Sequence, residues 1–247
     1  MKLCILFILC FPYIANAGET INRPWYTLDY NEQHEVANWV AYSLDSSQQQ
    51  NCVPRRNSFR VDPLVSTGSA EIIDYANSGF DRGHLLPAGD MKFDAQAMRD
   101  SFYLSNITPQ PAGFNRGRWG QLENLIRAWT SKYGKLWIVT GPVLRTSLGW
   151  IGQNNRVSVP EEYFKVILRK ENSGYKGIAF LMATDVPFPE LEPYSLEIDS
   201  IENLTKINFF PFLGEAHERE SEGSFNVNDW DFTARFDYLP CSTSEAL

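Results

Sequence analysis

The sequence predicts one α+β domain built on an antiparallel sheet with a few helices. Its 247 residues include 43% hydrophobic residues, which is enough for a sizeable core. Two β-rich runs, Glu162 to Leu168 and Gly177 to Ala183, flank a polar turn and indicate an antiparallel hairpin. An amphipathic run from Arg116 to Tyr133 indicates a helix. No linker or internal repeat divides the chain, so these elements are expected to share one core.

The first part of the chain is expected to begin with a loop and continue into strands. Residues 18–32 are mixed polar and aromatic and are expected to form an entry loop. His34 to Leu44 is rich in strand-forming residues and predicts a strand. Ser58 to Val61 predicts a short strand that ends before a proline.

The middle of the chain is expected to alternate between helix and loop. Asp94 predicts the N-cap of a helix that reaches about Phe102. Asn106 to Phe114 contains two prolines and a glycine and is expected to be loop. The amphipathic helix then runs to Tyr133, and Gly134 ends it.

After this helix the chain is expected to return to the sheet. Leu136 to Thr140 predicts a strand that precedes the hairpin. Ser195 predicts the cap of a short helix over Ile198 to Leu204. The domain core is expected to span about residues 25–213, and the acidic tail, 214–247, to be irregular.

The first 17 residues have the features of a cleaved signal peptide. A lysine is followed by a short apolar run, and Ala15-Asn16-Ala17 is a small-x-small cleavage signal. The alternative, a membrane anchor, is disfavoured because the run is too short to span a bilayer. We therefore expect an exported protein, periplasmic or secreted, with no membrane attachment after cleavage and a single domain over 18–247.

Export would place the remaining cysteines in an oxidising compartment, where they can form a disulfide. Two of the four lie in the predicted signal peptide, which leaves Cys52 and Cys241 in the mature chain. Two cysteines in an oxidising compartment commonly pair, although two separate buried thiols are the alternative. A bridge would fasten the C-terminal tail to the N-terminal third of the domain.

Charge is unevenly distributed along the chain. The net charge is −8, but residues 18–184 carry 18 basic and 16 acidic residues, whereas residues 185–237 carry 3 and 13. Local field governs the approach of a polyanion, so the first part is the better candidate for binding one. The acidic part is expected to face away.

Chemistry-bearing residues concentrate between Phe80 and Glu123. Asp81-Arg82-Gly83-His84 is followed by Asn106 and then by Asn115-Arg116-Gly117-Arg118-Trp119-Gly120-Gln121-Leu122-Glu123. A titratable base, arginines, amides and a carboxylate suit chemistry on a phosphate with a hard metal ion. The sequence has no His-Glu-x-x-His motif, no P-loop and no Gly-x-Ser-x-Gly elbow.

Together these two motifs resemble the DNA/RNA non-specific endonuclease family, to which mitochondrial endonuclease G belongs. Val139-Thr140-Gly141-Pro142-Val143, Tyr163-Phe164-Lys165 and Phe209-Phe210-Pro211 extend the resemblance, which covers roughly residues 25–213. The resemblance implies a ββα-metal (His-Me finger) fold set in a larger α+β domain with a central antiparallel sheet. It also implies Mg²⁺, with Mn²⁺ as an alternative, and DNA and RNA as substrates.

The resemblance also assigns roles to individual residues. His84 matches the general base, Asn115 the direct metal ligand and Glu123 a carboxylate that places the waters of the metal. Arg82 matches an arginine near the phosphate, and Asn106 a supporting polar residue of the catalytic group. The upstream phosphate-binding arginine matches either Arg60 or Arg56. Arg116 and Arg118 are further candidates for phosphate binding, with ordinary surface charge as the alternative.

Physical chemistry makes these roles intelligible. A neutral imidazole can accept a proton from water, and Mg²⁺ prefers oxygen ligands and keeps several waters. Eight residues along an ideal helix span about 12 Å, too far for Asn115 and Glu123 to ligate one ion directly. Either Asn115 precedes the helix and folds back, or Glu123 acts through a water, which we predict. A solvent-facing carboxylate is the alternative for Glu123.

Two further assignments follow from position. Asp81 is expected to have a structural role, bonding backbone amides of a turn, with substrate or metal binding as the alternative. Trp119 and Trp129 fall on the apolar side of the helix and are expected to be core residues.

The sequence thus predicts an exported, Mg²⁺-dependent endonuclease that cuts DNA and RNA with little sequence preference and leaves 5′-phosphate ends. The alternatives are a catalytically inactive nucleic-acid-binding protein on the same scaffold and a phosphoesterase acting on small esters. The family resemblance further implies that the protein could form a homodimer.

Overall fold

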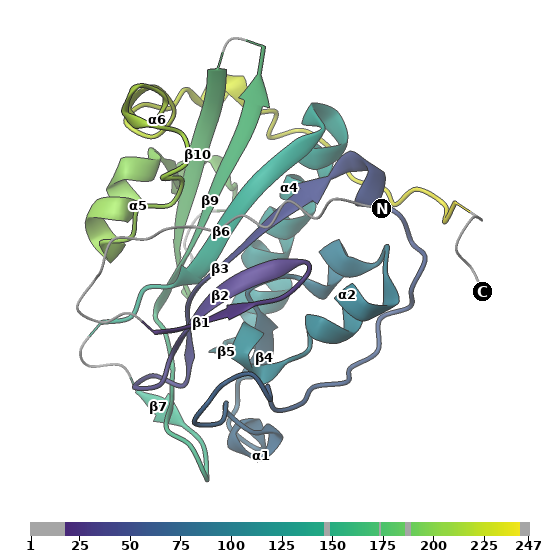
Figure 1. The fold of residues 1–247 in the computed structure, drawn as a ribbon, viewed down its shortest axis with the longest axis vertical. Coiled ribbons are helices and arrows are strands. Elements are labelled where there is room, and N and C mark those ends of the chain that lie inside the picture. Colours follow the sequence, from purple (N-terminus) through teal and green to yellow (C-terminus); the bar gives the residue numbers. More distant parts are fainter. Residues whose placement is uncertain (1–17, 146–148, 173, 186–188, 243–247) are drawn as a thin grey trace.

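The computed structural model describes residues 18–145, 149–172, 174–185 and 189–242. The predicted signal peptide therefore lies outside the described residues. A seven-stranded antiparallel sheet forms the centre of the molecule (Figure 1). Its strands, in spatial order, are β1 (Glu19–Asn22), β2 (Tyr26–Asn31), β3 (Val36–Asp45), β6 (Lys135–Pro142), β9 (Glu162–Glu171), β10 (Gly174–Ala183) and β11 (Ser195–Leu196).

Both faces of this sheet are covered, because side chains of the central strands alternate between two cores. Along β9, Tyr163 and Ile167 belong to one cluster, whereas Phe164, Val166 and Leu168 belong to the other. Alternation with apolar residues on both faces produces the nearly continuous apolar run seen in the sequence. The predicted hairpin is confirmed by ladder pairing of β9 with β10 from Glu162↔Ala183 to Glu171↔Gly174.

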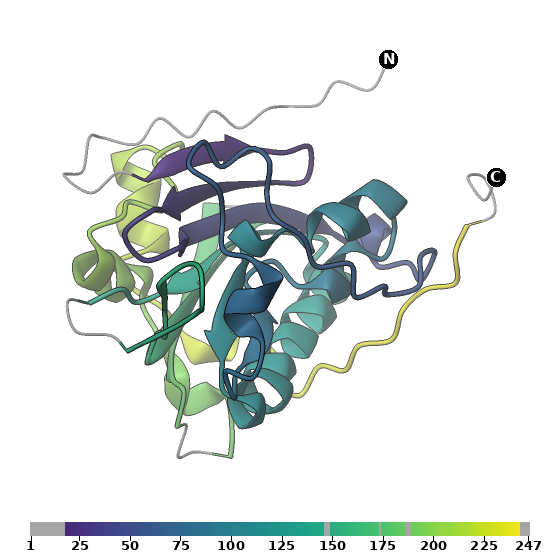
Figure 2. The ribbon, with the colours of Figure 1, turned by 90° about the horizontal axis from the view of Figure 1, so that it is seen from below.

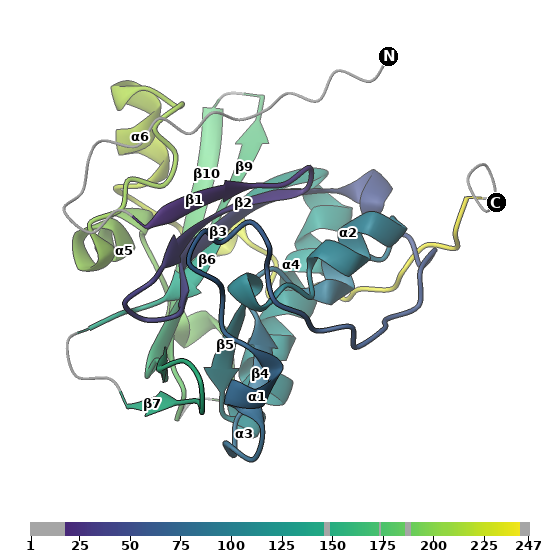
Figure 3. The same cartoon turned by 60° about the horizontal axis from the view of Figure 1, so that its bottom comes forward.

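One face of the sheet carries helix α4 (Gly120–Tyr133), the short helix α2 (Ala95–Asp100) and a small two-stranded sheet of β4 (Asp81–His84) and β5 (Ile107–Gln110) (Figures 1 and 3). The expected helix boundaries are partly confirmed: Gly134, at φ 90°, ends α4, and the carboxylate of Asp94 accepts hydrogen bonds from the first turn of α2. Trp119 and Trp129 are buried, as predicted.

The opposite face carries α5 (Ile198–Thr205) and α6 (Glu215–Ser221), which lie beside one another in Figures 1 and 2. Shorter elements complete the chain: α1 (Ile72–Tyr75), α3 (Ala112–Phe114), β7 (Trp150–Ile151) and β8 (Val157–Ser158). Much of the acidic region thus lies across the sheet from β4 and α4. Among the described residues, no helix is both apolar enough and long enough to span a membrane.

Several expected elements are wrong, and most of the errors concern strands. Residues 18–32 are not a loop, because β1 and β2 pair with each other and β2 pairs with β3. Asn106 to Phe114 includes β5, which pairs with β4, so the Asp81–His84 segment is a strand rather than a turn. Ser58 to Val61 forms only one isolated bridge, Arg60 to Tyr103.

Two expectations for the C-terminal part also fail. Ser195 does not cap α5, because it lies in β11 opposite Phe180, and Glu197 takes the N-cap position. The segment after Gly214 begins with α6 rather than with irregular chain. Further along the tail, Trp230 is buried against Trp129, with ring centroids 4.7 Å apart.

The predicted disulfide is present between Cys52 and Cys241, whose Cα atoms are 4.7 Å apart. Around it, the tail runs beside the N-terminal segment: Asn51 N donates to Leu239 O, and Leu239 N donates to Gln49 O. Tyr238 also donates through its hydroxyl to Gly89 O at 3.0 Å. The end of the chain is therefore joined to residues that border β4 and α4.

Candidate active site

A polar cleft of about 410 Å³ opens where β4, the residues after it and the start of α4 meet. It collects side chains that lie up to 72 positions apart in the sequence. The lining residues are Arg55, Asn57, Phe59, Asp81, Arg82, His84, Pro87, Ala88, Gly89, Asn115, Arg116, Glu123 and Arg127. Of the residues predicted from sequence, His84, Arg82, Asn115, Glu123 and Arg116 are brought together here.

His84 ends strand β4 and lies in an aromatic wall of the cleft. Its ring centroid is 5.5 Å from that of Phe59 and 4.9 Å from that of Phe102, and the Nε2 atom is enclosed without a hydrogen-bond partner. Burial, with a smaller effect from the positive charge of Arg55, lowers the pKa of His84 to about 3. The imidazole is therefore neutral throughout the neutral pH range.

Asn115 is oriented by a carboxylate. Its Nδ2 donates to Asp81 Oδ2 at 2.9 Å, so the amide oxygen is left free to accept or to bind a cation. The same carboxylate pairs with Arg116 through two hydrogen bonds of 2.7 and 2.6 Å. Arg116, followed by Asn115, lowers the pKa of Asp81 and so keeps it ionised. Asp81 was expected to bond backbone amides of a turn, but its observed partners are these two side chains, and it lies in a strand.

Asn115 and Glu123 do not share one ideal helix. Asn115 opens a π-helical turn over Asn115–Trp119, and Gly117 interrupts it with φ −96° and ψ −114° before α4 begins. The first of the two predicted arrangements, with Asn115 before the helix, is the one observed. Both residues line the cleft, whereas the action of Glu123 through a water stays a prediction.

A buried layer of charge lies beneath the cleft. Lys165 is fully buried, with Nζ 3.1 Å from Thr140 Oγ1 and 4.5 Å from the centre of the Trp119 ring. Burial lowers its pKa to about 8 and raises the pKa of Glu123. Lys165, and then Arg127, oppose the shift of Glu123, so buried cations favour its charged form.

Arg127 is itself fixed by a buried ion pair. Its Nη1 is 2.6 Å from Asp90 Oδ1, and Asp90 also accepts from the hydroxyl of Tyr42 at 2.9 Å. Gly89 permits this packing, because a Cβ there would lie 2.8 Å from Arg127 Nη1. A buried ion pair thus holds Arg127 in place at the floor of the cleft.

The arginines divide into two groups. Arg82, Arg116 and Arg55 line the cleft. Of these, Arg82 lies over the ring of Phe59. The sequence motifs put forward Arg56 and Arg60 but not Arg55. Only the tertiary position of the loop distinguishes it from them.

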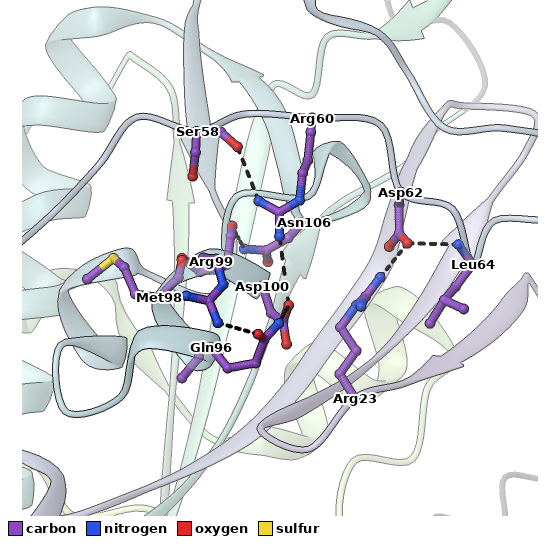
Figure 4. A network of polar contacts seen from close by, with 12 residues as sticks. Arg23, Ser58, Arg60, Asp62, Leu64, Gln96, Met98, Arg99, Asp100 and Asn106 are labelled. Carbon is purple, nitrogen blue, oxygen red and sulfur yellow. Dashed lines mark hydrogen bonds and ion pairs between the residues drawn. The ribbon is translucent and has the colours of Figure 1, made fainter. Parts of the chain in front are cut away.

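Arg60, Arg56 and Arg118 are not among the lining residues. Arg60 is engaged elsewhere: it donates to Ser58 O at 3.2 Å and approaches Asp100 Oδ1 at 3.8 Å (Figure 4). Its guanidinium also lies over the Tyr103 ring. Arg118 donates to the side chain of Gln121.

Asn106 is buried and fully engaged with backbone. Its Oδ1 accepts from Leu86 N, and its Nδ2 donates to Leu86 O and Ser101 O. The residue does not line the cleft and instead fixes the chain that follows His84.

The oxygen donors of the cleft fit a hard divalent cation. The free amide oxygen of Asn115 and the carboxylate of Glu123 are the ligand types that Mg²⁺ accepts, and an open polar cleft leaves room for its waters. His84 is the one histidine among the lining residues, and none is a cysteine, so the donor set does not suit structural zinc.

The fold and the residues of the cleft define a class of nuclease. A family model for DNA/RNA non-specific endonucleases matches residues 12–215, and the chain belongs to this family. Nuclease C1 of Cunninghamella echinulata var. echinulata is 34% identical over 223 residues, covering 83% of this chain and 88% of that protein. A nuclease of Nostoc sp. is 34% identical over 198 residues, covering 74% and 70%.

Mitochondrial proteins are also related. Human mitochondrial nuclease EXOG is 34% identical over 206 residues, covering 76% of this chain but 56% of that protein. A crystal structure of the EndoG/EndoGI complex, described as showing the mechanism of EndoG inhibition, matches with a TM-score of 0.71 and 28% identity. The match covers 78% of this chain and 86% of that one.

Proposed function

We propose that this protein is an exported, Mg²⁺-dependent endonuclease that hydrolyses phosphodiester bonds in both DNA and RNA and leaves 5′-phosphate ends. Family membership supports the nuclease activity. One observation carries the mechanism: the cleft combines a neutral, desolvated imidazole with an oriented amide oxygen and several arginines.

His84 acts as the general base. Because Nε2 is enclosed, Nδ1 is the ring nitrogen that receives a proton from water in the cleft. A substrate phosphate would add negative charge near the ring and so oppose the smaller effect of Arg55.

Asn115 would hold the metal ion through its amide oxygen, and Glu123 would act on it through a water. Asp81 fixes the amide so that its oxygen, not its nitrogen, is available. When bound, Mg²⁺ supplies positive charge that stabilises the scissile phosphate and the departing 3′ oxygen. Mn²⁺ suits the same oxygen ligands.

Arg82, Arg116 and Arg55 contact the phosphates that flank the scissile bond. Guanidinium groups form charge-assisted hydrogen bonds to phosphate without reading the bases. Arg56, Arg60 and Arg118 lie outside the cleft lining, so any contact they make is to more distant phosphates. Backbone contacts of this kind account for cutting with little sequence preference.

Export is supported by the disulfide, since structural disulfides are rare in reducing compartments. Periplasmic and secreted locations are both consistent with it. The homodimer implied by the family resemblance stays a prediction.

The test uses the mature protein with supercoiled plasmid and with RNA, in Mg²⁺ and in chelator. Mg²⁺-dependent cutting of both polymers is expected, and His84→Ala should lower kcat by about 10²–10⁴-fold. His217→Ala is the matched control, because His217 is exposed on α6. Cutting that survives His84→Ala would refute the base, and binding without cutting by the unmodified protein would favour the inactive nucleic-acid-binding alternative.

A further inference from the structure

Three carboxylates converge on the sheet face opposite the cleft, where α5 meets the end of α6. Asp199 and Glu202 belong to α5, and Glu222 follows α6 directly. One oxygen from each residue lies within 4.8 Å of the others. Figures 1 and 2 show that α5 and α6 lie beside each other.

Glu222 sets this cluster apart from an ordinary acidic surface patch. Its side chain is only 2% exposed, and its buried Oε1 atom has no hydrogen-bond partner. A buried carboxylate oxygen without a partner is costly, and such groups normally meet a cation or a donor.

The groups that act electrostatically on Glu222 are acidic. The charged groups acting on Glu222 are the carboxylates of Glu202, Glu218 and Asp199. Among the described residues, no lysine or arginine forms an ion pair with any member of the cluster. Burial, and then these neighbouring carboxylates, raise the pKa of Glu222 to about 8, so without a bound cation the cluster retains a proton at neutral pH.

The backbone fixes the cluster in this arrangement. Asp199 N donates to Glu222 O at 3.1 Å, which joins the start of α5 to the end of α6. Glu202 Oε1 accepts from Phe209 N at 2.7 Å, which leaves its other oxygen free. At Gly223, a Cβ would lie 3.0 Å from Asp199 Oδ2, so the chain passes close to the cluster.

We propose that Asp199, Glu202 and Glu222 form a second cation site, distinct from the cleft, that binds Ca²⁺ and links α5 to α6. Calcium binds oxygen ligands at about 2.3–2.6 Å and tolerates irregular geometry, so one ion can bridge oxygens at this spacing. Magnesium demands near-ideal octahedral geometry and dehydrates reluctantly, which makes it the poorer fit. The bound ion would neutralise the buried oxygen of Glu222 and hold α6 against the sheet.

The experiment is a calcium titration by isothermal calorimetry, carried out on the full mature chain with its disulfide intact. An Asn115→Ala background removes the metal ligand proposed for the cleft, so the remaining binding reports the second site. One Ca²⁺ per chain is expected. Adding Glu222→Gln should weaken binding by about tenfold or more, since it removes a direct ligand charge.

Glu220→Gln is the matched control, because Glu220 lies on α6 but outside the cluster. It should leave the affinity unchanged. Asp199→Asn provides a second variant with the same expected loss, should Glu222→Gln fold poorly. Absence of calcium uptake in the Asn115→Ala background, or uptake that neither cluster variant weakens, would overturn the proposal and leave protonation of Glu222 as the way in which the cluster is accommodated.

Discussion

Burial of His84 should make the stability of this protein depend on pH in a way that one substitution removes. The unfolded chain carries a histidine with a pKa of about 6.5, whereas in the folded chain the pKa is about 3. Between these values the unfolded state binds more protons, so His84 lowers the free energy of unfolding as the pH falls. The effect is absent above about pH 6.5 and grows below it.

Its magnitude follows from the size of the shift. Each pH unit within this window is worth about 1.4 kcal/mol, so lowering the pH from 7.5 to 5.0 should cost about 2 kcal/mol through His84 alone. His84→Gln replaces the ring with a group that does not titrate. Between pH 7.5 and pH 5.0, the free energy of unfolding of the variant should therefore fall by about 2 kcal/mol less than that of the unmodified protein.

The assay is urea unfolding at both pH values, followed by tryptophan fluorescence. The difference between the two losses of unfolding free energy contains no contribution from the carboxylates, because they titrate in both proteins. It also contains no pH-independent effect of the substitution on stability. His217→Gln, at an exposed position, should behave like the unmodified protein. Equal losses in the unmodified protein and in His84→Gln would refute the argument that desolvation keeps the imidazole neutral.

Three further predictions concern the cleft and the bridge. Arg55→Ala should lower kcat/KM by about 10-fold or more, because it removes a charge-assisted phosphate contact, whereas Arg56→Ala should change kcat/KM little. Steady-state assays on plasmid compare the two variants, and equal effects would argue against the assignment of Arg55. Lys165→Met removes the buried cation that opposes the raised pKa of Glu123, so the acid limb of the pH–activity profile should move to higher pH. An unmoved limb would exclude a charged role for that carboxylate. Replacing Cys52 and Cys241 by serine should lower the free energy of unfolding by about 2–5 kcal/mol in urea titrations, and a loss below 1 kcal/mol would mean that the tail packs independently of the bridge.

Elements with strong internal periodicity could be predicted from the sequence. The amphipathic pattern of α4 and the apolar runs of β9 and β10 are local signals, and the structure confirms them. β1, β2 and β5 could not be predicted in this way, because each depends on a partner strand elsewhere. Residues 18–32 look irregular until β3 provides the edge on which β2 pairs.

The residues of the candidate site also divide into those that a local sequence pattern predicts and those that it does not. His84, Arg82, Asn115 and Glu123 lie within two short motifs, so their sequence pattern was enough to place them in one cleft. Arg55 has two arginine neighbours of identical chemistry, and no pattern ranks the three.

Other groupings depend on long-range contacts that no local pattern reports. Asn106 satisfies backbone groups of Leu86 and Ser101, which only the folded chain brings to it. The grouping of Glu222 with Asp199, more than twenty residues away, likewise appears only when α5 and α6 meet.

The link between Cys52 and Cys241 also bears on the order of biosynthesis. Arg55, on the wall of the cleft, lies three residues after the first of these cysteines, whereas the second lies 189 residues further along the chain than the first. A ribosome must therefore add all of these residues, those of β4 and α4 included, before this covalent tie can form. Until then the nascent chain has the residues that line the cleft but lacks the fastening beside them.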